Sequence, residues 1–275
     1  MANLPNNNFT TNTLSLHAGY EYDRQRTLSV PIYQSTAYSF ENAEQAAARF
    51  SLEELGNIYS RLTNPTVDML AKRIASVEGG AFGVATASGS SAVFYSLVNL
   101  AQNGDNIAYS NKIYGGSQTL LVHVLKRFGI EGRVFDIDNL SSLEKIIDDK
   151  TKAIFFESLS NPQIAIADVE TITNIAKKHK IVTICDNTVA TPILFRPFDF
   201  GVDVSVHSLT KYINGHGSGL GGAVIEREGL NELIKDNSRY PAFNTPDESY
   251  HGLIYANLPL PIFSIRCSRW VTNTN

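Results

Sequence analysis

The stretch DVSVHSLTKYINGHGSGLGG (203–222) joins a short apolar strand to a glycine-rich loop. Hydroxyl groups at Ser208 and Thr210 follow the strand, and one lysine, Lys211, precedes five glycines. Glycines allow the backbone to approach a ligand closely, and a lysine beside such a loop can form a Schiff base with a carbonyl group. The alternative is a surface loop that happens to carry a lysine, so the rest of the sequence has to decide.

The composition is that of an ordinary globular protein, with 43% hydrophobic and 18% charged residues among 275. A formal net charge of −4 argues against nucleic acid as the main partner. The two cysteines, Cys185 and Cys267, do not suggest a disulfide framework and favour a reducing compartment. Because MANLPNNNFTTNT (1–13) has no apolar signal core and no apolar run could span a bilayer, we expect a cytoplasmic protein without a membrane partner.

Strand and helix patterns alternate from Phe82 onward. Short apolar runs predict strands at 82–87, 106–110, 133–137, 153–157, 181–185, 202–206 and 222–226. Helical patterns fill most of the gaps between them, at 90–102, 116–128, 140–149 and 168–179. Alternation of this kind predicts an α/β fold with a mostly parallel sheet and helices on both faces.

The sequence before this region is less regular. Residues 1–28 are polar and are typical of an arm that must pack on something else to be ordered. NAEQAAARF (42–50) has the composition of a short helix. Asn64 and Pro65 fit the N-cap and the first position of a helix that runs to Glu78, where two glycines end it.

Polar or reactive side chains follow five of the predicted strands. In open α/β sheets, ligands bind at the carboxyl ends of the strands, so these groups are expected to share one rim of the sheet. They are Ser88-Gly89-Ser90 after the first strand, Tyr114 after the second, Glu157 to Asn161 after the fourth, Asp186 after the fifth, and Ser208, Thr210 and Lys211 after the sixth.

Each of these groups has a functional and a purely structural interpretation. Ser88-Gly89-Ser90 offers backbone N–H groups at a helix N-terminus to a phosphate, or is only a helix N-cap. Asp186 caps a turn or pairs with a protonated ring nitrogen. Tyr114 is a turn residue or a ring held against a ligand. Tyr59 and Arg61 are surface residues, or the arginine clamps an anion.

Taken together, the groups match the requirements of pyridoxal 5'-phosphate (PLP). That cofactor needs donors for its phosphate, a carboxylate for its pyridinium nitrogen and a lysine for its aldehyde. Other sites are less well supported. The G-x-G-x-x-G match at 217–222 precedes a strand instead of following one, and no G-x-S-x-G motif occurs. The histidines and cysteines lack zinc-ligand spacing, so no metal site is expected, and His207, His216 and His251 are interpreted as turn or supporting residues. Cys185 is interpreted as a core residue.

Six motifs resemble the cystathionine γ-synthase-like group of PLP enzymes of cysteine and methionine metabolism, which have fold type I. They are YSRLTNPT (59–66), ASGSSA (87–92), YGG (114–116), ESLSNP (157–162), CDNT (185–188) and DVSVHSLTKYINGHG (203–217). The resemblance extends from about residue 14 to residue 266. Within the group, NAEQAAARFSLEELGNIYSR (42–61) and AFNTPDESYHGLIY (242–255) are most similar to the branch that acts on O-acetylhomoserine.

The resemblance implies a role for each residue at the predicted rim. Lys211 would bind the cofactor aldehyde and later move the substrate proton, Asp186 would pair with the pyridine nitrogen, and Tyr114 would stack on the ring. Asn161 would lie near the ring oxygen. The phosphate would be held by Gly89, Ser90, Ser208 and Thr210, and by Tyr59 and Arg61 of a neighbouring subunit. Ser90 stands where the family usually has methionine, which a backbone N–H contact tolerates.

The implied reaction is a γ-replacement in which O-acetylhomoserine and sulfide give homocysteine and acetate. The implied partners are therefore an amino-acid ester, sulfide and further copies of the chain in a homodimer or homotetramer. Methionine γ-lyase or cystathionine synthase or lyase chemistry is an alternative, because those enzymes share every cofactor residue named above.

The resemblance stops after Arg266, where CSRWVTNTN (267–275) departs from the family pattern. Relatives continue into a C-terminal domain whose arginine binds the substrate α-carboxylate, and its absence would expose apolar surface. We therefore expect an N-terminal arm (1–58), a PLP-binding α/β domain (59–262) and a divergent tail (263–275) in place of the C-terminal domain. A truncated fragment that only binds PLP or dimerises is the alternative of a different class.

Overall fold

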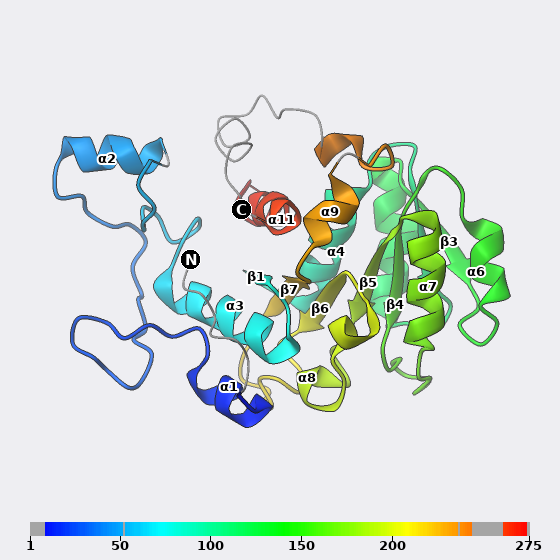
Figure 1. Ribbon diagram of the computed structural model, residues 1–275, viewed down its shortest axis with the longest axis horizontal. Coiled ribbons are helices and arrows are strands. Elements are labelled where there is room, and N and C mark those ends of the chain that lie inside the picture. Colours follow the sequence, from blue (N-terminus) through cyan, green and yellow to red (C-terminus); the bar gives the residue numbers. More distant parts are fainter. Residues whose placement is uncertain (1–8, 52, 236, 244–260, 274–275) are drawn as a thin grey trace.

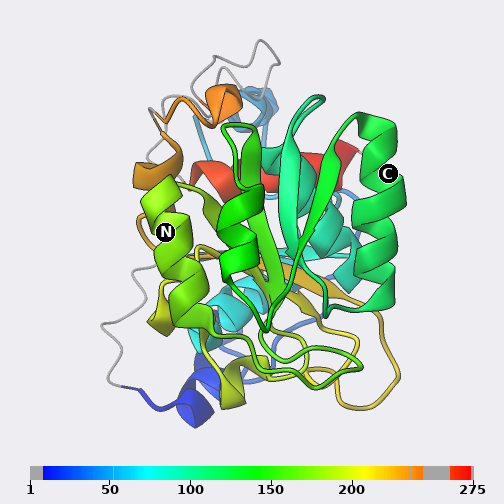
Figure 2. The same ribbon diagram turned by 90° about the vertical axis from the view of Figure 1, so that its right-hand side faces the viewer.

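A seven-stranded sheet forms the centre of the computed structural model, which describes residues 9–51, 53–235, 237–243 and 261–273 (Figures 1 and 2). The strand order is β1-β7-β6-β5-β4-β2-β3. The strands are β1 (Phe82–Thr86), β2 (Asn106–Ser110), β3 (Glu131–Phe135), β4 (Thr151–Glu157), β5 (Val182–Asp186), β6 (Val204–Ser208) and β7 (Gly222–Glu226).

The sheet is mostly parallel, as predicted. β3, β2, β4, β5 and β6 are parallel neighbours, whereas β7 is antiparallel to both β6 and β1. Residues 209–221, between β6 and β7, contain no helix. A parallel connection needs a crossover, usually a helix, whereas an antiparallel strand can follow from a loop. The lysine-bearing loop therefore makes a return connection, which explains the reversed strand.

Both faces of the sheet are buried, because alternate residues of one strand enter different hydrophobic clusters. Ala153 and Phe155 of β4 belong to the cluster beneath α4 (Gly89–Leu100), and Ile154 and Phe156 belong to the cluster on the opposite face. All four side chains are fully buried. This burial explains why β4 has a continuous apolar sequence instead of an alternating one.

The helix before the sheet has the predicted limits. α3 (Pro65–Glu78) begins after Asn64, whose Oδ1 accepts the N–H groups of Thr66 and Val67, and ends at Gly79, which has a φ of 83°. A residue with a side chain would be strained at that angle. The remaining helices of eight or more residues in the described part are α2 (Ala43–Phe50), α7 (Val169–His179) and α11 (Ile262–Asn273).

Several predicted elements differ from the structure in their limits, and β4 starts at Thr151 instead of residue 153 while β6 spans Val204–Ser208 instead of 202–206. The predicted helix at 116–128 is divided into α5 (Gly115–Thr119), a π-helical turn η1 (Leu120–Val124) and a 3₁₀ turn η2 (Leu125–Phe128). The helix predicted at 140–149 is limited to α6 (Ser141–Ile146). β3 starts at Glu131 instead of residue 133, because Glu131 lies opposite Asn106 of β2 and its N–H donates to Asp105. Short connecting elements are α8 (Thr191–Leu194), η3 (Pro197–Phe200), α9 (Leu230–Ile234) and η4 (Pro241–Phe243).

The N-terminal arm contains one helix that its polar sequence did not predict. α1 (Thr11–His17) packs on α3, and Leu14 is its buried residue. The predicted helix at 42–50 is present as α2, which begins after Asn42 and lies well away from the sheet in Figure 1. In the rest of the described arm, regular pairing is limited to an isolated bridge between Ala37 and Tyr59.

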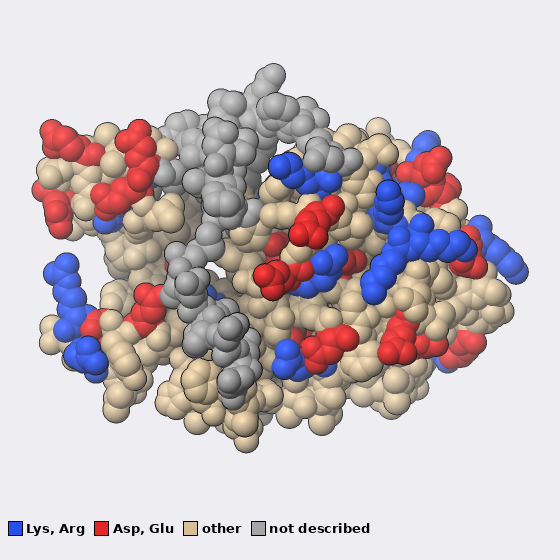
Figure 3. All heavy atoms as spheres, viewed as in Figure 1, with Lys and Arg blue, Asp and Glu red and all other residues tan. Residues whose placement is uncertain are grey.

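The surface combines both signs of charge. On the face shown in Figure 3, Lys and Arg side chains are interspersed with Asp and Glu side chains. This face provides no extended basic field of the kind that nucleic-acid binding uses. Among the helices within the described ranges, none has both the length and the apolar character needed to cross a bilayer.

α11, which includes part of the predicted tail, packs into the core beside α4. Its Phe263 and Cys267 side chains are fully buried. The Glu226 carboxylate at the end of β7 accepts hydrogen bonds from the Ser264 N–H (2.8 Å) and Ser264 hydroxyl (2.7 Å). Burial raises the pKa of Glu226 to about 7, although these hydrogen bonds oppose the increase. The attachment of α11 therefore involves a carboxyl group that titrates near neutral pH.

Replacing Glu226 with glutamine tests this attachment. A raised pKa means that the folded protein binds the proton more tightly than the unfolded chain, so this group stabilises the fold fully below its ordinary pKa of 4.5, and that stabilisation is lost as the pH rises through 7. Glu226→Gln cannot ionise. The difference between the free energies of unfolding of Glu226→Gln and of the wild type should therefore shift in favour of the variant by about 1–3 kcal/mol as the pH rises from about 5 to about 8. Urea unfolding of both proteins at both pH values measures this difference in free energy. The same difference at both pH values would contradict a raised pKa of Glu226.

Candidate functional site

The carboxyl ends of β4, β5 and β6 lie side by side and end in polar residues. Glu157 of β4 is paired in register with Asp186 of β5, and Asp186 with Val206 of β6, next to His207 and Ser208. The parallel pairing thus brings the predicted groups of three strands to one edge of the sheet, as the strand-end argument expects.

The N-terminus of α4 packs directly against the end of β6. Ser88 is the N-cap, and its hydroxyl accepts the Ser91 N–H at 3.1 Å. A Cβ atom on Gly89 would lie 2.5 Å from the Ser208 Cβ and 2.7 Å from the Ser208 Cα, so only glycine fits there. The first N–H groups of the helix, including that of the exposed Ser90, lack partners within the helix. This arrangement offers an anion both backbone N–H donors and the Ser208 hydroxyl.

Asp186 lies beside this helix end and is held by Thr188. The Asp186 Oδ1 accepts the Thr188 N–H at 3.0 Å, and the Thr188 hydroxyl oxygen accepts the Ser208 N–H at 2.8 Å. Burial raises the pKa of Asp186, and the hydrogen bonds from Thr188 oppose that increase. No ion pair to Asp186 occurs among the described residues. His207, which is ion-paired with Glu78, also lowers the pKa of Asp186, and a protonated ring nitrogen would provide a direct ion-pair partner.

Glu157 occupies the same edge, where the sequence predicts it among the polar groups after the fourth strand, although no contact with a ligand was expected of it. Its side chain is 5% exposed, and its two oxygens accept the N–H groups of Tyr114 (2.6 Å) and Asn161 (2.9 Å). Burial, and then the charge of Asp186, raise the pKa of Glu157 to about 7.

Thr210 and Lys211 lie in the loop that follows β6. The Thr210 hydroxyl oxygen accepts the Gly221 N–H at 3.1 Å and the hydroxyl donates to the Gly221 carbonyl at 3.3 Å, which closes the base of the loop. The Lys211 N–H donates to the Ser208 carbonyl, and the Lys211 side chain is exposed. The amine is therefore free to reach a ligand at the sheet edge.

The aromatic and arginine candidates are exposed. The Tyr114 side chain is 51% exposed and lies against Gly116. Arg61 lies over the Tyr59 ring, with 5.5 Å between its guanidinium carbon and the ring centre. Among the described residues, no hydrogen bond or ion pair joins Tyr59 or Arg61 to the residues at the strand ends. The fold therefore gathers the other predicted residues at one edge, without a polar contact to these two among the described residues.

A buried polar cluster lies next to the strand-end site and links the end of α3 to β6. His207 Nε2 lies 2.8 Å from Glu78 Oε2, and both side chains are fully buried. The other Glu78 oxygen accepts hydrogen bonds from Ser205 (2.8 Å) and Asn187 (3.0 Å). Burial opposes the charged histidine, but Glu78 raises the pKa of His207 above its ordinary value. His207 is thus a supporting residue within β6 instead of a turn residue.

The remaining histidine and cysteine predictions have simple outcomes. His216 lies in an exposed loop, where its Nδ1 is 2.6 Å from the Asn214 carbonyl oxygen. Cys185 is fully buried, as a core residue should be. His251, and most of the stretch 242–255, lie outside the described residues.

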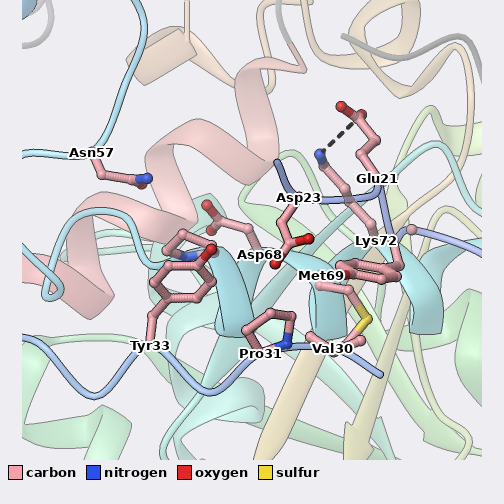
Figure 4. Close-up of a pocket in the computed structure, with 12 residues that line it drawn as sticks. Glu21, Asp23, Val30, Pro31, Tyr33, Asn57, Asp68, Met69 and Lys72 are labelled. Carbon is pink, nitrogen blue, oxygen red and sulfur yellow. Dashed lines mark ion pairs between the residues drawn. The ribbon is translucent and has the colours of Figure 1, made fainter. Parts of the chain in front are cut away.

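A separate cavity lies between the arm and α3 (Figure 4). It has a volume of about 270 Å³, and Tyr33, Asp68 and Lys72 are among its lining residues. Lys72 forms a 3.9 Å ion pair with Glu21 at its margin. None of the predicted site residues lines this cavity, so it is not part of the strand-end site.

PLP fits the strand-end site. The close packing of Gly89 on Ser208 brings the helix N-terminus to the strand end, Asp186 has no direct ion-pair partner among the described residues, and the Lys211 side chain is exposed. These three features match the three parts of the cofactor that a protein binds, which are the phosphate, the ring nitrogen and the aldehyde.

The close packing of Gly89 makes a specific mutational prediction. Gly89→Ala should destabilise the fold by about 1–3 kcal/mol, because the added Cβ meets backbone and Cβ atoms that cannot move away easily. Gly219→Ala is the matched control, since its Cβ would meet only the Asn214 side chain at 3.9 Å. Urea unfolding of both variants checks this; equal stabilities would show that the helix end is not tightly packed.

Comparison with known proteins agrees with this site. A family model described as Cys/Met metabolism PLP-dependent enzyme matches residues 12–251. The O-acetyl-L-homoserine sulfhydrylase of Corynebacterium glutamicum is 44% identical over 258 residues, which cover 92% of this chain and 59% of that protein. The homocysteine/cysteine synthase of Saccharomyces cerevisiae is 40% identical over 247 residues, which cover 88% of this chain and 55% of that protein.

A crystal structure from Campylobacter jejuni, described as an O-acetylhomoserine (thiol)-lyase carrying pyridoxyl-lysine phosphate, is also similar. It superposes with a TM-score of 0.93 and 69% identity, covering 96% of this chain and 65% of that one. The chain thus spans between half and two thirds of the length of these proteins. The family match over most of its length shows that it belongs to the Cys/Met metabolism PLP-dependent enzymes.

Proposed function

We propose that this chain provides the PLP-binding part of an enzyme that converts O-acetylhomoserine and sulfide to homocysteine and acetate. The observation that carries the proposal is the convergence of Gly89, Asp186 and Lys211 at one edge of the sheet. The choice of substrate is supported by the relatives named O-acetyl-L-homoserine sulfhydrylase or homocysteine synthase, which are 40–44% identical.

The proposed cofactor contacts follow from the position of each group. Asp186 would pair with the protonated ring nitrogen, Lys211 would bind the aldehyde, and the Tyr114 ring would cover the cofactor. Asn161 would lie near the ring oxygen. The phosphate would be held by the backbone N–H groups of Gly89 and Ser90, with Ser88 capping that helix, and by the hydroxyls of Ser208 and Thr210.

Bound PLP supplies an electron sink that makes the substrate Cα–H bond acidic. The remaining steps belong to the protein. Lys211 Nζ, once released by the amino acid, would take the Cα proton, and removal of a Cβ proton would then let acetate leave Cγ. Sulfide would add at Cγ, and protons would return to Cβ and Cα to give homocysteine. Asp186 would keep the ring nitrogen protonated during these transfers. The Thr210 hydroxyl would donate to the phosphate instead of the Gly221 carbonyl.

We propose that the chain acts as a homo-oligomer in the cytoplasm, with residues 1–58 as an arm, 59–262 as the cofactor domain and 263–275 as a divergent tail. The arm exposes large apolar side chains, with Leu28 86% and Ile32 83% exposed, which a second copy would cover. Tyr59 and Arg61 would then reach the phosphate of the neighbouring subunit. The absence of a polar contact, among the described residues, between these two and the strand ends of the same chain supports this arrangement.

Reduction with borohydride in the presence of PLP tests the central assignment. The label should be attached to Lys211 in the wild-type chain and should disappear in Lys211→Ala, whereas it should persist in a control with the exposed Lys126 replaced by alanine. Peptide mapping by mass spectrometry locates the label. A label on any other lysine would rule out the proposed site.

The reaction is tested by comparing two products. A sulfhydrylase should release acetate from O-acetylhomoserine only when sulfide is present, and Lys211→Ala should be slower by roughly 10²–10⁴-fold or more, the usual contribution of a general base. Sulfide-independent formation of α-ketobutyrate would instead identify a γ-lyase. The cystathionine γ-lyase of Lactobacillus plantarum, whose structure is 31% identical with a TM-score of 0.73, makes that comparison necessary.

Mixing two inactive variants tests the shared site. Arg61→Ala and Lys211→Ala should each bind PLP poorly, because each lacks one half of every site. Mixed oligomers contain one site with both residues intact, so mixing should restore borohydride labelling at a PLP concentration too low to label either variant alone. Labelling that stays at the level of the separate variants would place Arg61 in its own subunit's site or outside it.

A further inference from the structure

One carboxylate joins the two segments that flank the candidate cofactor site. Glu157 is the last residue of β4, and its Oε1 accepts the Tyr114 N–H at 2.6 Å while its Oε2 accepts the Asn161 N–H at 2.9 Å. Tyr114 follows β2, and Asn161 lies in the loop after β4, so neither segment is fixed by the sheet itself. A single buried side chain thus holds both.

We propose that Glu157 is a positioning residue, which fixes the backbones of Tyr114 and Asn161 and so sets where their side chains meet the cofactor. This inference rests on the proposed PLP site. Glu157 itself need not touch the cofactor, because both of its oxygens already accept hydrogen bonds from the protein.

The hydrogen bonds explain why this position needs a carboxylate. α5 begins directly after Tyr114 and has no side-chain cap, so Glu157 is the acceptor for the Tyr114 N–H at that helix start. Two N–H donors that converge on one side chain need two acceptor oxygens, and glutamine has only one. The amide NH₂ of a glutamine would face one of the donors, and that buried N–H would lose its partner.

The Tyr114 ring is placed through its backbone. Its ring atoms would lie 2.5 Å from a Cβ on Gly116, so the ring lies directly over that glycine. The ring is also half exposed. Moving the Tyr114 N–H away from Glu157 would therefore tilt the ring that is expected to cover the cofactor.

The groups around Glu157 make the strength of its hydrogen bonds to these two segments depend on pH. Asp186 of β5 lies beside it in register, Cys185 precedes that residue, and His207 of β6 acts on Asp186. Burial and the charge of Asp186 raise the pKa of Glu157 to about 7. Below that pH, Glu157 gains a proton, and one oxygen becomes a donor facing an N–H group. The two segments should then be held less firmly as the pH falls from about 8 to about 6.

The test compares Glu157→Gln and Glu157→Asp with Asp168→Asn. Asp168 is the matched control, because its carboxylate also accepts a backbone N–H (Thr171, 3.0 Å) but is exposed and is hydrogen-bonded within the first turn of α7. For each purified chain, PLP affinity is measured by fluorescence titration between about pH 6 and about pH 8.5. Circular dichroism in the PLP absorption band reports how the ring is held, and urea unfolding reports stability without cofactor.

If Glu157 is a positioning residue, Glu157→Gln weakens PLP binding by roughly 10–100-fold at about pH 8, which corresponds to one lost charge-assisted hydrogen bond. It also changes the circular dichroism of bound PLP and reduces the pH dependence near 7. Glu157→Asp keeps a titrating carboxylate and part of the affinity. Asp168→Asn leaves the affinity and the spectrum as in wild type, with at most a loss of stability.

Two results would overturn the inference. The first is a Glu157→Gln protein with wild-type affinity, spectrum and pH dependence. The second is a loss of stability in both Glu157 variants with an unchanged spectrum of bound PLP. That result would show that Glu157 stabilises the fold but does not position the residues of the site. If the wild-type chain itself is not labelled at Lys211 by PLP and borohydride, the proposed function fails, and this inference fails with it.

Discussion

The hydrogen-bonded register between β4 and β5 is the constraint on which the site depends. It places Glu157 directly beside Asp186 at the edge of the sheet, and parallel β6 adds Ser208 next to them. Two carboxyl groups side by side repel each other when both are ionised, which costs folding free energy. The fold offsets part of this cost with backbone N–H donors to each group. The repulsion that remains between the two carboxylates favours the binding of a cation.

The same edge is made rigid from the opposite face of the sheet. The buried pair of Glu78 and His207 connects the end of α3 to β6, and Asn187 extends the cluster to the residue after Asp186. A buried ion pair is costly unless its hydrogen bonds are satisfied; here both Glu78 oxygens have partners, whereas the His207 Nδ1 has none among the described residues. Such a cluster contributes less to stability than apolar packing would, but it fixes the relative positions of α3, β5 and β6. The residues of the site are therefore presented on a stiff support.

Local sequence signals predicted the elements that are determined locally. Asn64, Pro65 and Gly79 marked both ends of α3, and the continuous apolar sequence of β4 indicated a strand buried on two faces. The strand-end rule then placed Gly89, Asp186 and Ser208 on one edge, where the structure has them linked through direct packing and Thr188. The sequence of the polar arm did not predict α1, because α1 has one buried residue, Leu14, and a single apolar position gives no periodic pattern.

By itself, the sequence determined the fold class, the family and the identity of the residues that converge, because strand periodicity, helix caps and short motifs are properties of neighbouring residues. The tertiary structure alone decided the antiparallel direction of β7, the packing of α11 on α4 and the role of Glu157 as an acceptor for two distant N–H groups. These features depend on pairing and burial between segments far apart in the chain. No local pattern specifies which acceptor a given N–H group will meet, since that is settled only when the sheet has assembled.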